Sequence, residues 1–326
     1  MSDMHLKKNW SDKEATRKGF GRGLLEAGKA DKNIVALCAD LTESTNMHVF
    51  AQEFPERYIE VGVAEQNLAT IGAGMAAIGK VPFVSSYAAF SPGRNWEQIR
   101  TTVCLNDRPV KIVGSHAGVS VGPDGATHQM LEDIALMRAL PNMVVVAPGD
   151  SVEAQKATLA MAKDKRPNYL RLARADTPIF TSPHTPFQIG QAYVFRAGTD
   201  ITIIATGTMT YQALEAAKIL ADKNISVEVV HCPTIKPLDE ETILTSAKKT
   251  RHVMTVEEAQ ITGGLGGAVA ELMGENLPTA MARVGMRDRF GESGEPEELI
   301  KYFGLDGEGI AKAAQKLLTD HTNHAH

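Results

Sequence analysis

One carboxylate of this chain stands where carboxylates are rare. Glu65 lies between a short β-like run and an apolar helical pattern, three residues before Leu68. Apolar residues three and four positions apart share one face of a helix, which here would contain Leu68, Ile71, Met75 and Ile78. The spacing predicts that Glu65 belongs to that buried face, in the first turn of the helix. Because a buried charge without a partner is costly, Glu65 is a candidate for catalysis or for an ion pair.

A second group of reactive side chains lies in the glycine-rich loop HAGVSVGPDGATHQ, residues 116–129. His116 and His128 are twelve residues apart in this loop, and Asp124 stands between them. Imidazole gains and loses a proton near neutral pH, so histidines in polar loops are suited to proton transfer and to ligand binding. The segment around Asp124 also has an ordinary explanation, since Gly-Pro-Asp-Gly is typical of a turn.

Ten short β-rich runs alternate with helical stretches and would position these groups. They are residues 33–38, 58–63, 82–86, 110–115, 143–147, 168–173, 201–206, 226–231, 252–258 and 279–285. Strands separated by helices predict α/β domains, each with a mostly parallel sheet covered by helices on both faces. The length of 326 residues suits two such domains, divided by a proline-rich linker. We predict a first domain over 10–175, a linker over 176–190, a second domain over 191–319 and a disordered tail over 320–326.

Polar and aromatic residues follow five strands of the first predicted domain. They are Asp40, Ser44, Glu65, Tyr87, Phe90, His116, Asp124, His128 and Arg174. Ligands of parallel α/β sheets bind at the carboxyl ends of the strands, which meet at one edge. Each residue alone has a structural alternative, such as helix capping for Asp40 or core packing for Tyr87. Their common position predicts a binding site at this edge.

Composition and charge exclude several classes of protein. The chain has 34 basic and 39 acidic residues, a net charge of −5 without long runs of like charge, which argues against nucleic acid or an anionic membrane as partner. Cys38, Cys104 and Cys232 lie in or beside apolar runs and predict buried thiols. We find no signal core, no apolar stretch of about 18 residues and no metal-ligand spacing. We therefore expect a soluble cytoplasmic protein without a metal site of its own.

Four motifs together resemble one known family. CADLTESTN (38–46), GVAEQN (62–67), the loop 116–129 followed by LMRALPNMVVVAP (136–148), and LRLAR (170–174) resemble the pyrimidine-binding domain of transketolases, and the rest of the chain resembles their C-terminal domain. The resemblance covers nearly the whole chain. It begins where a full transketolase is about half finished, before which the family has a domain that binds the cofactor's diphosphate through magnesium. The chain thus resembles the C-terminal subunit of a gene-split transketolase.

The resemblance implies thiamine diphosphate as cofactor and assigns residues to it. Glu65 matches a glutamate that exchanges a proton with the cofactor's aminopyrimidine ring, which activates the thiazolium carbon for attack on a ketose. Tyr87 and Phe90 match aromatics that pack on that ring, although the family usually has phenylalanine at the first position. Asp40 and Leu41 match residues that hold the bent conformation of the cofactor. Mg²⁺ would be held by the partner subunit.

Other matching positions would bind the sugar. His128 matches a histidine that faces the reacting sugar, and Asp124 matches the residue that binds the hydroxyl next to the carbonyl. The glutamate usual before Asp124 is replaced by Pro123 here. A cluster that grips the terminal phosphate is matched by Arg17, Ser44, His116 and Arg174. Guanidinium groups are well suited to phosphate oxygens.

The resemblance implies transfer of a two-carbon ketol unit between a ketose phosphate and an aldose phosphate, as in the pentose phosphate pathway. The partner would be an N-terminal transketolase subunit, in an α2β2 heterotetramer, and the lone chain would form at most a homodimer. Three alternatives remain open at this point. They are a rare-sugar-phosphate transketolase, another thiamine-diphosphate enzyme (deoxyxylulose-phosphate synthase or the beta subunit of a 2-oxo acid dehydrogenase), and a non-catalytic homologue that binds a partner.

Overall fold

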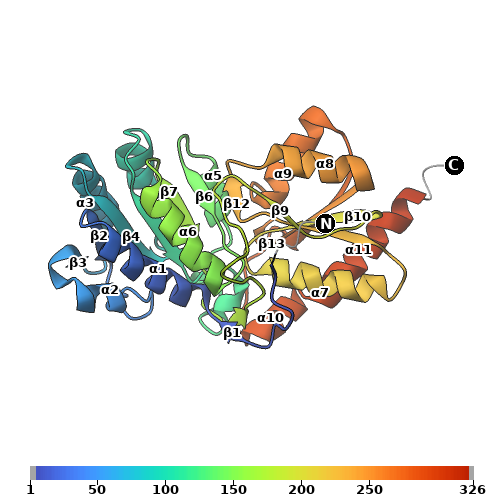
Figure 1. Cartoon of the computed structure of the whole chain (residues 1–326), viewed down its shortest axis with the longest axis horizontal. Coiled ribbons are helices and arrows are strands. Elements are labelled where there is room, and N and C mark those ends of the chain that lie inside the picture. Colours follow the sequence, from blue (N-terminus) through green and yellow to red (C-terminus); the bar gives the residue numbers. More distant parts are fainter. Residues whose placement is uncertain (1–4, 323–326) are drawn as a thin grey trace.

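Two α/β units follow one another along the chain in the computed structural model, which describes residues 5–322 (Figure 1). The first sheet has the spatial order β12 (Thr234–Lys236), β6 (Val144–Val146), β7 (Asn168–Arg171), β5 (Lys111–Ser115), β4 (Val81–Tyr87), β2 (Ile34–Cys38) and β3 (Tyr58–Glu60). The second has the order β14 (Ala280–Met286), β13 (His252–Gln260), β10 (Ile201–Ala205), β11 (Val227–His231) and β9 (Tyr193–Arg196). Only β12 in the first sheet and β9 in the second pair antiparallel among these described strands.

All ten predicted strands are present, and the predicted fold class is confirmed. The short strands β9 and β12 were not predicted. A two-stranded antiparallel sheet of β1 (Lys13–Glu14) and β8 (Thr177–Pro178) was not predicted either, and β8 lies within the range 176–190 that we predicted as a linker.

The helices lie between the strands. Those of the first unit are α1 (Thr16–Ala30), α2 (His48–Glu53), α3 (Glu65–Ala77), α4 (Trp96–Gln98), α5 (Asp133–Arg138) and α6 (Ser151–Lys163), with a π-helical segment η2 (Ile99–Cys104) and the 3₁₀ turns η1 (Pro55–Arg57), η3 (Val119–Val121) and η4 (Gly125–Thr127). Those of the second are α7 (Met209–Ala221), α8 (Glu240–Thr250), α9 (Leu265–Asn276), α10 (Pro296–Tyr302) and α11 (Gly307–Thr322). Helix α11 extends into the range 320–326 for which we predicted a disordered tail, and residues 323–326 lie outside the described part.

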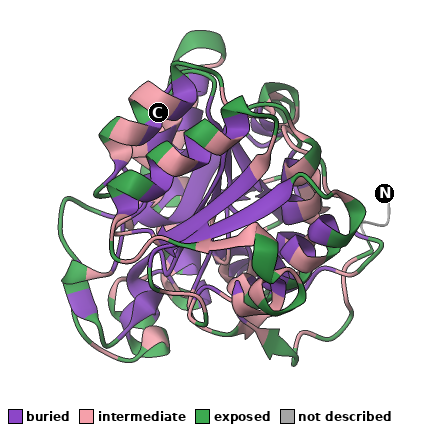
Figure 2. Ribbon diagram, turned by 90° about the vertical axis from the view of Figure 1, so that its left-hand side faces the viewer, coloured by how far each residue is buried: buried purple, intermediate pink, exposed green. Residues whose placement is uncertain are grey.

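Side chains of β2 point alternately to the two faces of the first sheet and show how both faces are covered. Ile34, Ala36 and Cys38 pack in a cluster with residues of α1, α2 and α6. Val35 and Leu37 point the other way, into a cluster with α3 and η2. Successive side chains of a strand alternate between faces, so a fully apolar strand needs helices on both sides. The strands at the centre are accordingly buried, while the surrounding helices keep exposed outer faces (Figure 2).

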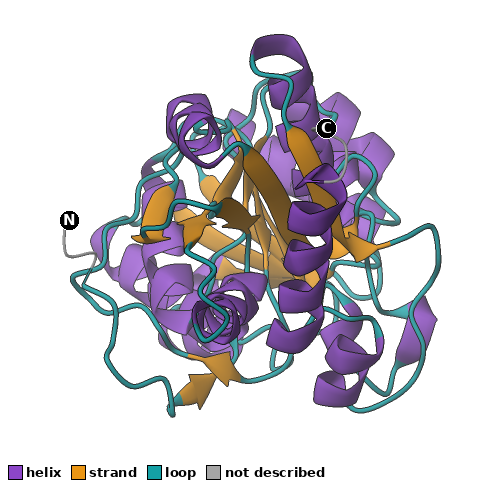
Figure 3. Ribbon diagram, turned by 90° about the vertical axis from the view of Figure 1, so that its right-hand side faces the viewer, coloured by secondary structure: helices purple, strands orange, loops and turns teal. Residues whose placement is uncertain are grey.

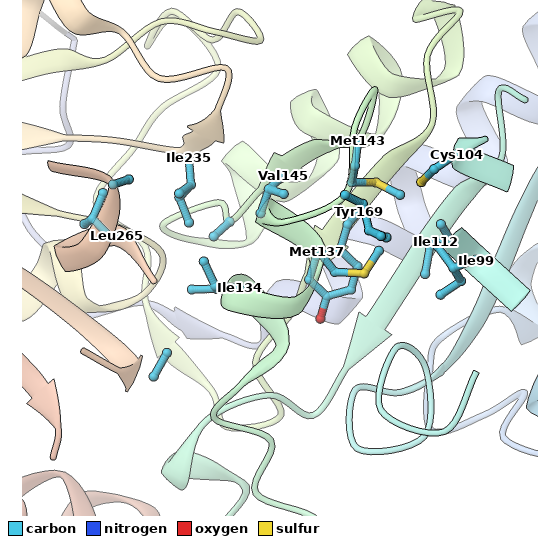
Figure 4. Packing of buried hydrophobic residues seen from close by; sticks show 14 of the residues in the cluster. Ile99, Cys104, Ile112, Ile134, Met137, Met143, Val145, Tyr169, Ile235 and Leu265 are labelled. Atoms are coloured by element: carbon cyan, nitrogen blue, oxygen red, sulfur yellow. The ribbon is translucent and has the colours of Figure 1, made fainter. Parts of the chain in front are cut away.

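Helices also cover both faces of the second sheet (Figure 3). Helices α7 and α11 pack on one face with Ile201 and Ile203 of β10, and α8 and α9 pack on the other with Ile204. The cluster on this second face continues into the first unit. It includes Ile235 of β12 and Tyr169 of β7, which lie along one continuous apolar layer (Figure 4). The two units therefore share part of their core.

The buried face of α3 differs from the prediction. Glu65 and Leu68 are buried as expected, but Ile71 and Met75 are only partly buried and Ile78 is 77% exposed. The face that packs on the sheet is completed instead by small residues, namely Ala69, Gly72, Ala73 and Ala76. A Cβ atom added at Gly72 would come within 2.8 Å of the Val84 side chain, so close approach of helix and strand selects small residues here.

Two further expectations concern the cysteines and the membrane. Cys38, Cys104 and Cys232 are buried and free, as predicted. Among residues 5–322, no helix combines the length and the apolar character that crossing a bilayer would require.

Candidate active site

Five parallel strands of the first sheet are neighbours in the order β7, β5, β4, β2 and β3, so their carboxyl ends lie along one edge. Tyr87 is the last residue of β4, and the other four strands are followed by Arg174, His116, Asp40 and Glu65. Register and direction of the strands, rather than sequence proximity, bring these side chains to the same side of the sheet.

Glu65 is the first residue of α3 and its side chain is 1% exposed. One carboxylate oxygen accepts a hydrogen bond from the Ser86 hydroxyl at 3.1 Å, and the other forms an ion pair with Arg94 at 2.8 Å. The Asn95 side chain donates to the Glu65 backbone carbonyl at 2.9 Å. A glutamate at the start of a helix often accepts backbone N–H groups, but both oxygens of Glu65 are held by side chains.

Four aromatic side chains form a cluster beside this carboxylate. The Tyr87 ring stacks on His116 with centroids 3.9 Å apart and faces Phe90 at 6.3 Å. His128 meets Phe90 edge-on at 5.4 Å and Tyr87 at 6.1 Å. The Arg94 guanidinium that pairs with Glu65 also lies 4.7 Å from the Phe90 ring centroid, which connects the carboxylate to the cluster. The two histidines of the loop 116–129 are thus brought together.

His116 is buried among cations. Its exposed fraction is 3%, and its Nδ1 lies 2.9 Å from the Ser115 hydroxyl. Burial, followed by the charges of Arg17, Arg174 and His128, lowers the pKa of His116 to about 3. The ring is therefore neutral at physiological pH and able to donate or accept a hydrogen bond without adding charge.

Arg17 and Arg174 make this part of the site strongly positive. Arg17 donates to the Ser44 carbonyl and Arg174 to the Val121 carbonyl, each at 2.7 Å. Neither guanidinium has a carboxylate within ion-pair distance in the part of the chain that is described, and the buried Arg17 Nε has no hydrogen-bond partner there. Burial and the nearby Arg174 lower the pKa of Arg17. Two adjacent cations with spare donors form a site suited to an anion.

Asp40, Leu41 and Asp124 lie at the border of the site. Asp40 is exposed, with a left-handed φ of 59°, and its backbone N–H donates to Glu60 at 2.7 Å. Leu41 is partly buried against the cluster that contains α1 and α6. Asp124 is exposed in the turn before η4. Within residues 5–322, no side-chain hydrogen bond or ion pair joins these three to the aromatic cluster, and the same holds for the Ser44 hydroxyl.

Sequence reasoning missed the residues that hold Glu65 and its loop. Ser86 and Arg94 were not considered, although both flank the predicted Tyr87 and Phe90. Glu60 was also missed. Its carboxylate accepts hydrogen bonds from the backbone N–H groups of Asp40 and Gly62, which ties the loop after β2 to the loop before Glu65.

These side chains offer one region suited to an anion and another suited to a flat heteroaromatic ring. The buried Glu65 carboxylate, with Tyr87 and Phe90, suits a ring that carries nitrogen donors. The orphaned Nε of Arg17 suits a phosphate oxygen. No group of three or more His, Cys, Asp or Glu side chains in the described residues is arranged to hold a metal ion.

Comparison with known families agrees with this fold. Residues 12–179 match the pyrimidine-binding domain of transketolase, and residues 190–310 match the transketolase C-terminal domain. The fold is thus that of two consecutive domains of a two-carbon-transfer enzyme family. The chain belongs to the transketolase family.

Individual relatives place the chain within that family. A transketolase C-terminal section from Methanocaldococcus jannaschii is 50% identical over 299 residues, which are 91% of this chain and 94% of the relative. The 6-deoxy-6-sulfo-D-fructose transketolase subunit SqwH of a Clostridium species is 42% identical, covering 90% of this chain and 91% of the relative. The chain is also similar to a solved split-gene transketolase, an inactive β4 tetramer, with a TM-score of 0.88 and 43% identity over 94% of this chain and 98% of the other. The chain corresponds to the C-terminal subunit of a split-gene transketolase.

Proposed function

We propose that this chain, joined to a separate subunit with the diphosphate-binding domain, transfers a two-carbon ketol unit from a ketose phosphate to an aldose phosphate. The observation that carries the proposal is the pair Arg17 and Arg174, without carboxylate partners in the described chain, beside His116 and the aromatic cluster. A phosphate site next to a buried glutamate and stacked rings is the combination that sugar-phosphate chemistry with a heteroaromatic cofactor needs.

Glu65 is the proposed proton-exchanging group. Thiamine diphosphate, when bound, would supply an electron sink for cleavage of the bond next to the ketose carbonyl. Glu65 would hold and exchange a proton at the aminopyrimidine ring, while Ser86 and Arg94 fix the orientation of its carboxylate. Tyr87 and Phe90 would pack against the ring, and Asp40 and Leu41 would border the rest of the cofactor. Mg²⁺ would be bound by the partner subunit.

The loop 116–129 and the two arginines would bind the sugar. His128, whose Nδ1 lies 2.9 Å from the Thr127 hydroxyl, is placed to hydrogen-bond the reacting hydroxyls. Asp124 would accept the hydroxyl next to the carbonyl. The phosphate group would be bound by Arg17, Ser44, His116 and Arg174. Neutral His116 would donate one N–H to the phosphate, and the two guanidinium groups would supply its countercharge.

A partner subunit is part of this proposal. Relatives that match almost their full length are named as a section or a subunit, and the solved neighbour made of beta chains alone is described as inactive. We propose an α2β2 assembly with two active sites. The neighbour is a tetramer of beta chains, which is larger than the homodimer we expected for the lone chain, so a β4 form is the expected state without the partner.

One relative favours a second candidate substrate. The relative SqwH is named for 6-deoxy-6-sulfo-D-fructose, a sugar whose terminal anion is a sulfonate. The arginine pair that suits a phosphate also suits a sulfonate, because both present several oxygens that accept N–H donors. A sulfosugar donor is therefore the alternative to a ketose phosphate.

The test is reconstitution with the diphosphate-domain subunit. Both subunits are co-purified, and ketol transfer to ribose 5-phosphate is followed with xylulose 5-phosphate and, in parallel, with 6-deoxy-6-sulfofructose as donor. We expect activity only with both subunits, thiamine diphosphate and Mg²⁺. Glu65→Gln should fold but lower turnover by about 10²–10⁴-fold, because general acid–base exchange is lost. No transfer from either donor, or near-normal turnover of Glu65→Gln, would contradict the proposal.

A further inference from the structure

The loop 287–295 of the second unit, which connects β14 to α10, lies against the loop 116–129 of the first. A Cβ atom added at Gly125 would come within 2.5 Å of the Ser293 hydroxyl, so the two loops leave no room for a side chain there. Gly125 is buried, whereas the preceding Asp124 is exposed. The loop 116–129 therefore rests on the second unit on one side and is open on the other.

Gln129 joins the two loops. It is 3% exposed, and its Nε2 donates to the carbonyl of Glu292 in the second unit at 2.8 Å. The same Nε2 lies within hydrogen-bond distance of the carbonyls of Gly122 and Val119, at 3.0 and 3.2 Å. Its Oε1 has no hydrogen-bond partner among residues 5–322. Gln129 therefore acts as a donor, and loss of its amide would remove all of these contacts at once.

A second contact from the same unit holds the loop near its start. The Glu258 carboxylate of β13 accepts from the Ser120 backbone N–H at 2.6 Å. A Cβ atom added at Gly118 would meet the same carboxylate at 2.3 Å. Ser120 and Gln129 thus attach both ends of the segment that contains Asp124 to the second unit.

The loop 287–295 is itself fixed to the sheet of the second unit. Gln260, at the end of β13, accepts from the Asp288 backbone N–H at 3.0 Å and donates to the Arg289 carbonyl at 2.8 Å. Its own backbone N–H donates to the Leu131 carbonyl of the first unit at 2.8 Å. The support of the loop 116–129 is therefore connected directly to a strand.

Asp124 and His128 depend on this backbone support for their position. Asp124 is exposed, and its side chain does not cap η4. The only hydrogen bond of the His128 side chain within the described residues is to the adjacent Thr127 hydroxyl, at 2.9 Å. The attachments at Ser120 and Gln129 thus set where the backbone carries both side chains. Displacement of a positioning group by about 1 Å can lower a rate about 100-fold.

We propose that Gln129 is a positioning residue through which the second unit holds Asp124 and His128 in place for the sugar, so that the C-terminal domain takes part in substrate recognition. This role rests on the proposed ketol transfer, in which these two residues bind the donor. It does not require the loop 287–295 to touch sugar or cofactor. Loss of the Gln129 contacts should therefore weaken sugar binding and leave cofactor binding at Glu65 unchanged.

Steady-state kinetics and calorimetry on the reconstituted enzyme test the effect on the sugar. Gln129→Met keeps the length of the side chain and removes its N–H donors. It should raise KM for the phosphorylated donor about tenfold and leave the Kd of thiamine diphosphate within about twofold. A loss of folded enzyme would instead lower kcat at unchanged KM, which separates positioning from simple destabilisation.

Two glycine variants of the second unit provide a matched pair. Gly291→Ala should act in the same direction as Gln129→Met, because its Cβ would lie 1.8 Å from the Gln129 Oε1. Gly274→Ala in α9 has open space around its Cβ and should behave as the wild type.

Hydrogen–deuterium exchange on the full chain tests the attachment without partner subunit or cofactor. In Gln129→Met and Gly291→Ala, the peptide that covers residues 116–129 should exchange at least about tenfold faster than in the wild type, because its opening costs less. In Gly274→Ala it should exchange at the wild-type rate.

Circular dichroism establishes that each variant is folded, and Gly291→Ala decides the question if Gln129→Met does not fold. Unchanged exchange of the loop, faster exchange with a wild-type KM, or an equal loss of affinity for the cofactor would overturn the proposal. An inactive wild-type enzyme would instead contradict the proposed ketol transfer, and hydrogen exchange alone would then decide whether the second unit holds the loop.

Discussion

Arg171 and Arg174 are three residues apart at the end of β7, yet they lie in opposite surroundings. The Arg171 side chain, 9% exposed, forms an ion pair with Asp133 at 2.8 Å and donates to the Glu258 carbonyl of β13 at 2.7 Å. Arg174 donates only to a backbone carbonyl of the loop 116–129, with Arg17 close by. Arg171 thus connects the first unit to the second, whereas Arg174 has no carboxylate partner among the described residues.

The difference shows that the partner decides the role of a buried cation. Asp133 is fully buried, and its Oδ2 accepts from the Tyr169 hydroxyl as well as from Arg171, each at 2.8 Å, whereas its Oδ1 has no hydrogen-bond partner among the described residues. Such a pair holds structure together, since loss of one member leaves the other charge uncompensated. Arg17 and Arg174 repel each other, and an anion between them would relieve this repulsion.

The largest expected change in stability comes from breaking the ion pair of Arg171 and Asp133. Arg171→Met should lower the free energy of unfolding by about 3–5 kcal/mol, because Asp133 stays buried without its cation. Arg174→Met, the matched control, should change it by less than about 1 kcal/mol. Urea unfolding of both variants measures this. Equal losses would mean that the two arginines do not differ in role.

The next largest effect is the pH dependence that His116 gives to the free energy of unfolding. The pKa of His116 is about 3 in the folded chain and near 6.5 when unfolded, so between these values the unfolded chain binds one more proton. The free energy of unfolding should therefore fall as pH drops from 6.5 towards 3, by up to about 5 kcal/mol from this residue. The measurement is the difference in the free energy of unfolding between the wild type and His116→Asn at each pH. If this difference did not vary with pH, burial and the neighbouring cations would not lower the pKa of His116.

A smaller effect is expected on substrate affinity. In the reconstituted enzyme, Arg174→Met should raise KM for the phosphorylated donor about 10–100-fold with little change in kcat, because one charge-assisted contact is lost. Arg174→Lys should recover part of the affinity, since it keeps the charge but loses the planar donor arrangement. The assay is repeated with an uncharged ketose. The same loss with that substrate would argue against phosphate binding.

The smallest effect tests the one paired carboxylate of the site. Ser86→Ala should lower the free energy of unfolding by only about 0.5–1.5 kcal/mol, because Glu65 keeps its ion pair with Arg94. Thermal or urea unfolding of the lone chain measures it. A loss as large as that of Arg171→Met would show that Ser86, and not Arg94, is the main partner of Glu65.

The sequence predicted the site residues through the topology of the sheet. Apolar runs marked the strands, parallel strands place their carboxyl ends together, and the residues that follow them are therefore neighbours. Glu65, Tyr87, Phe90, His116 and His128 were found in this way, and the structure brings them into one region. Their roles in catalysis and binding stay predictions.

The parts that were missed depend on contacts between elements. The partners of Glu65 are 21 and 29 residues away in sequence, and nothing in their local pattern indicates an ion pair. The helical periodicity around Ile71 suggested a buried face, but helix α3 approaches β4 so closely that only small residues fit. The hydrogen bond from Arg171 to the Glu258 carbonyl depends on how the two units dock, which single-element patterns do not contain.

Strand β12 has a consequence for how the protein holds together. Residues 234–236 belong to the second unit in sequence but complete the edge of the first sheet beside β6. Removing the second half of the chain would leave β6 with unpaired backbone groups, which invite aggregation through strand addition. The first half is therefore not a self-sufficient fragment, and because the two units share part of their core, heating should melt both in a single cooperative transition.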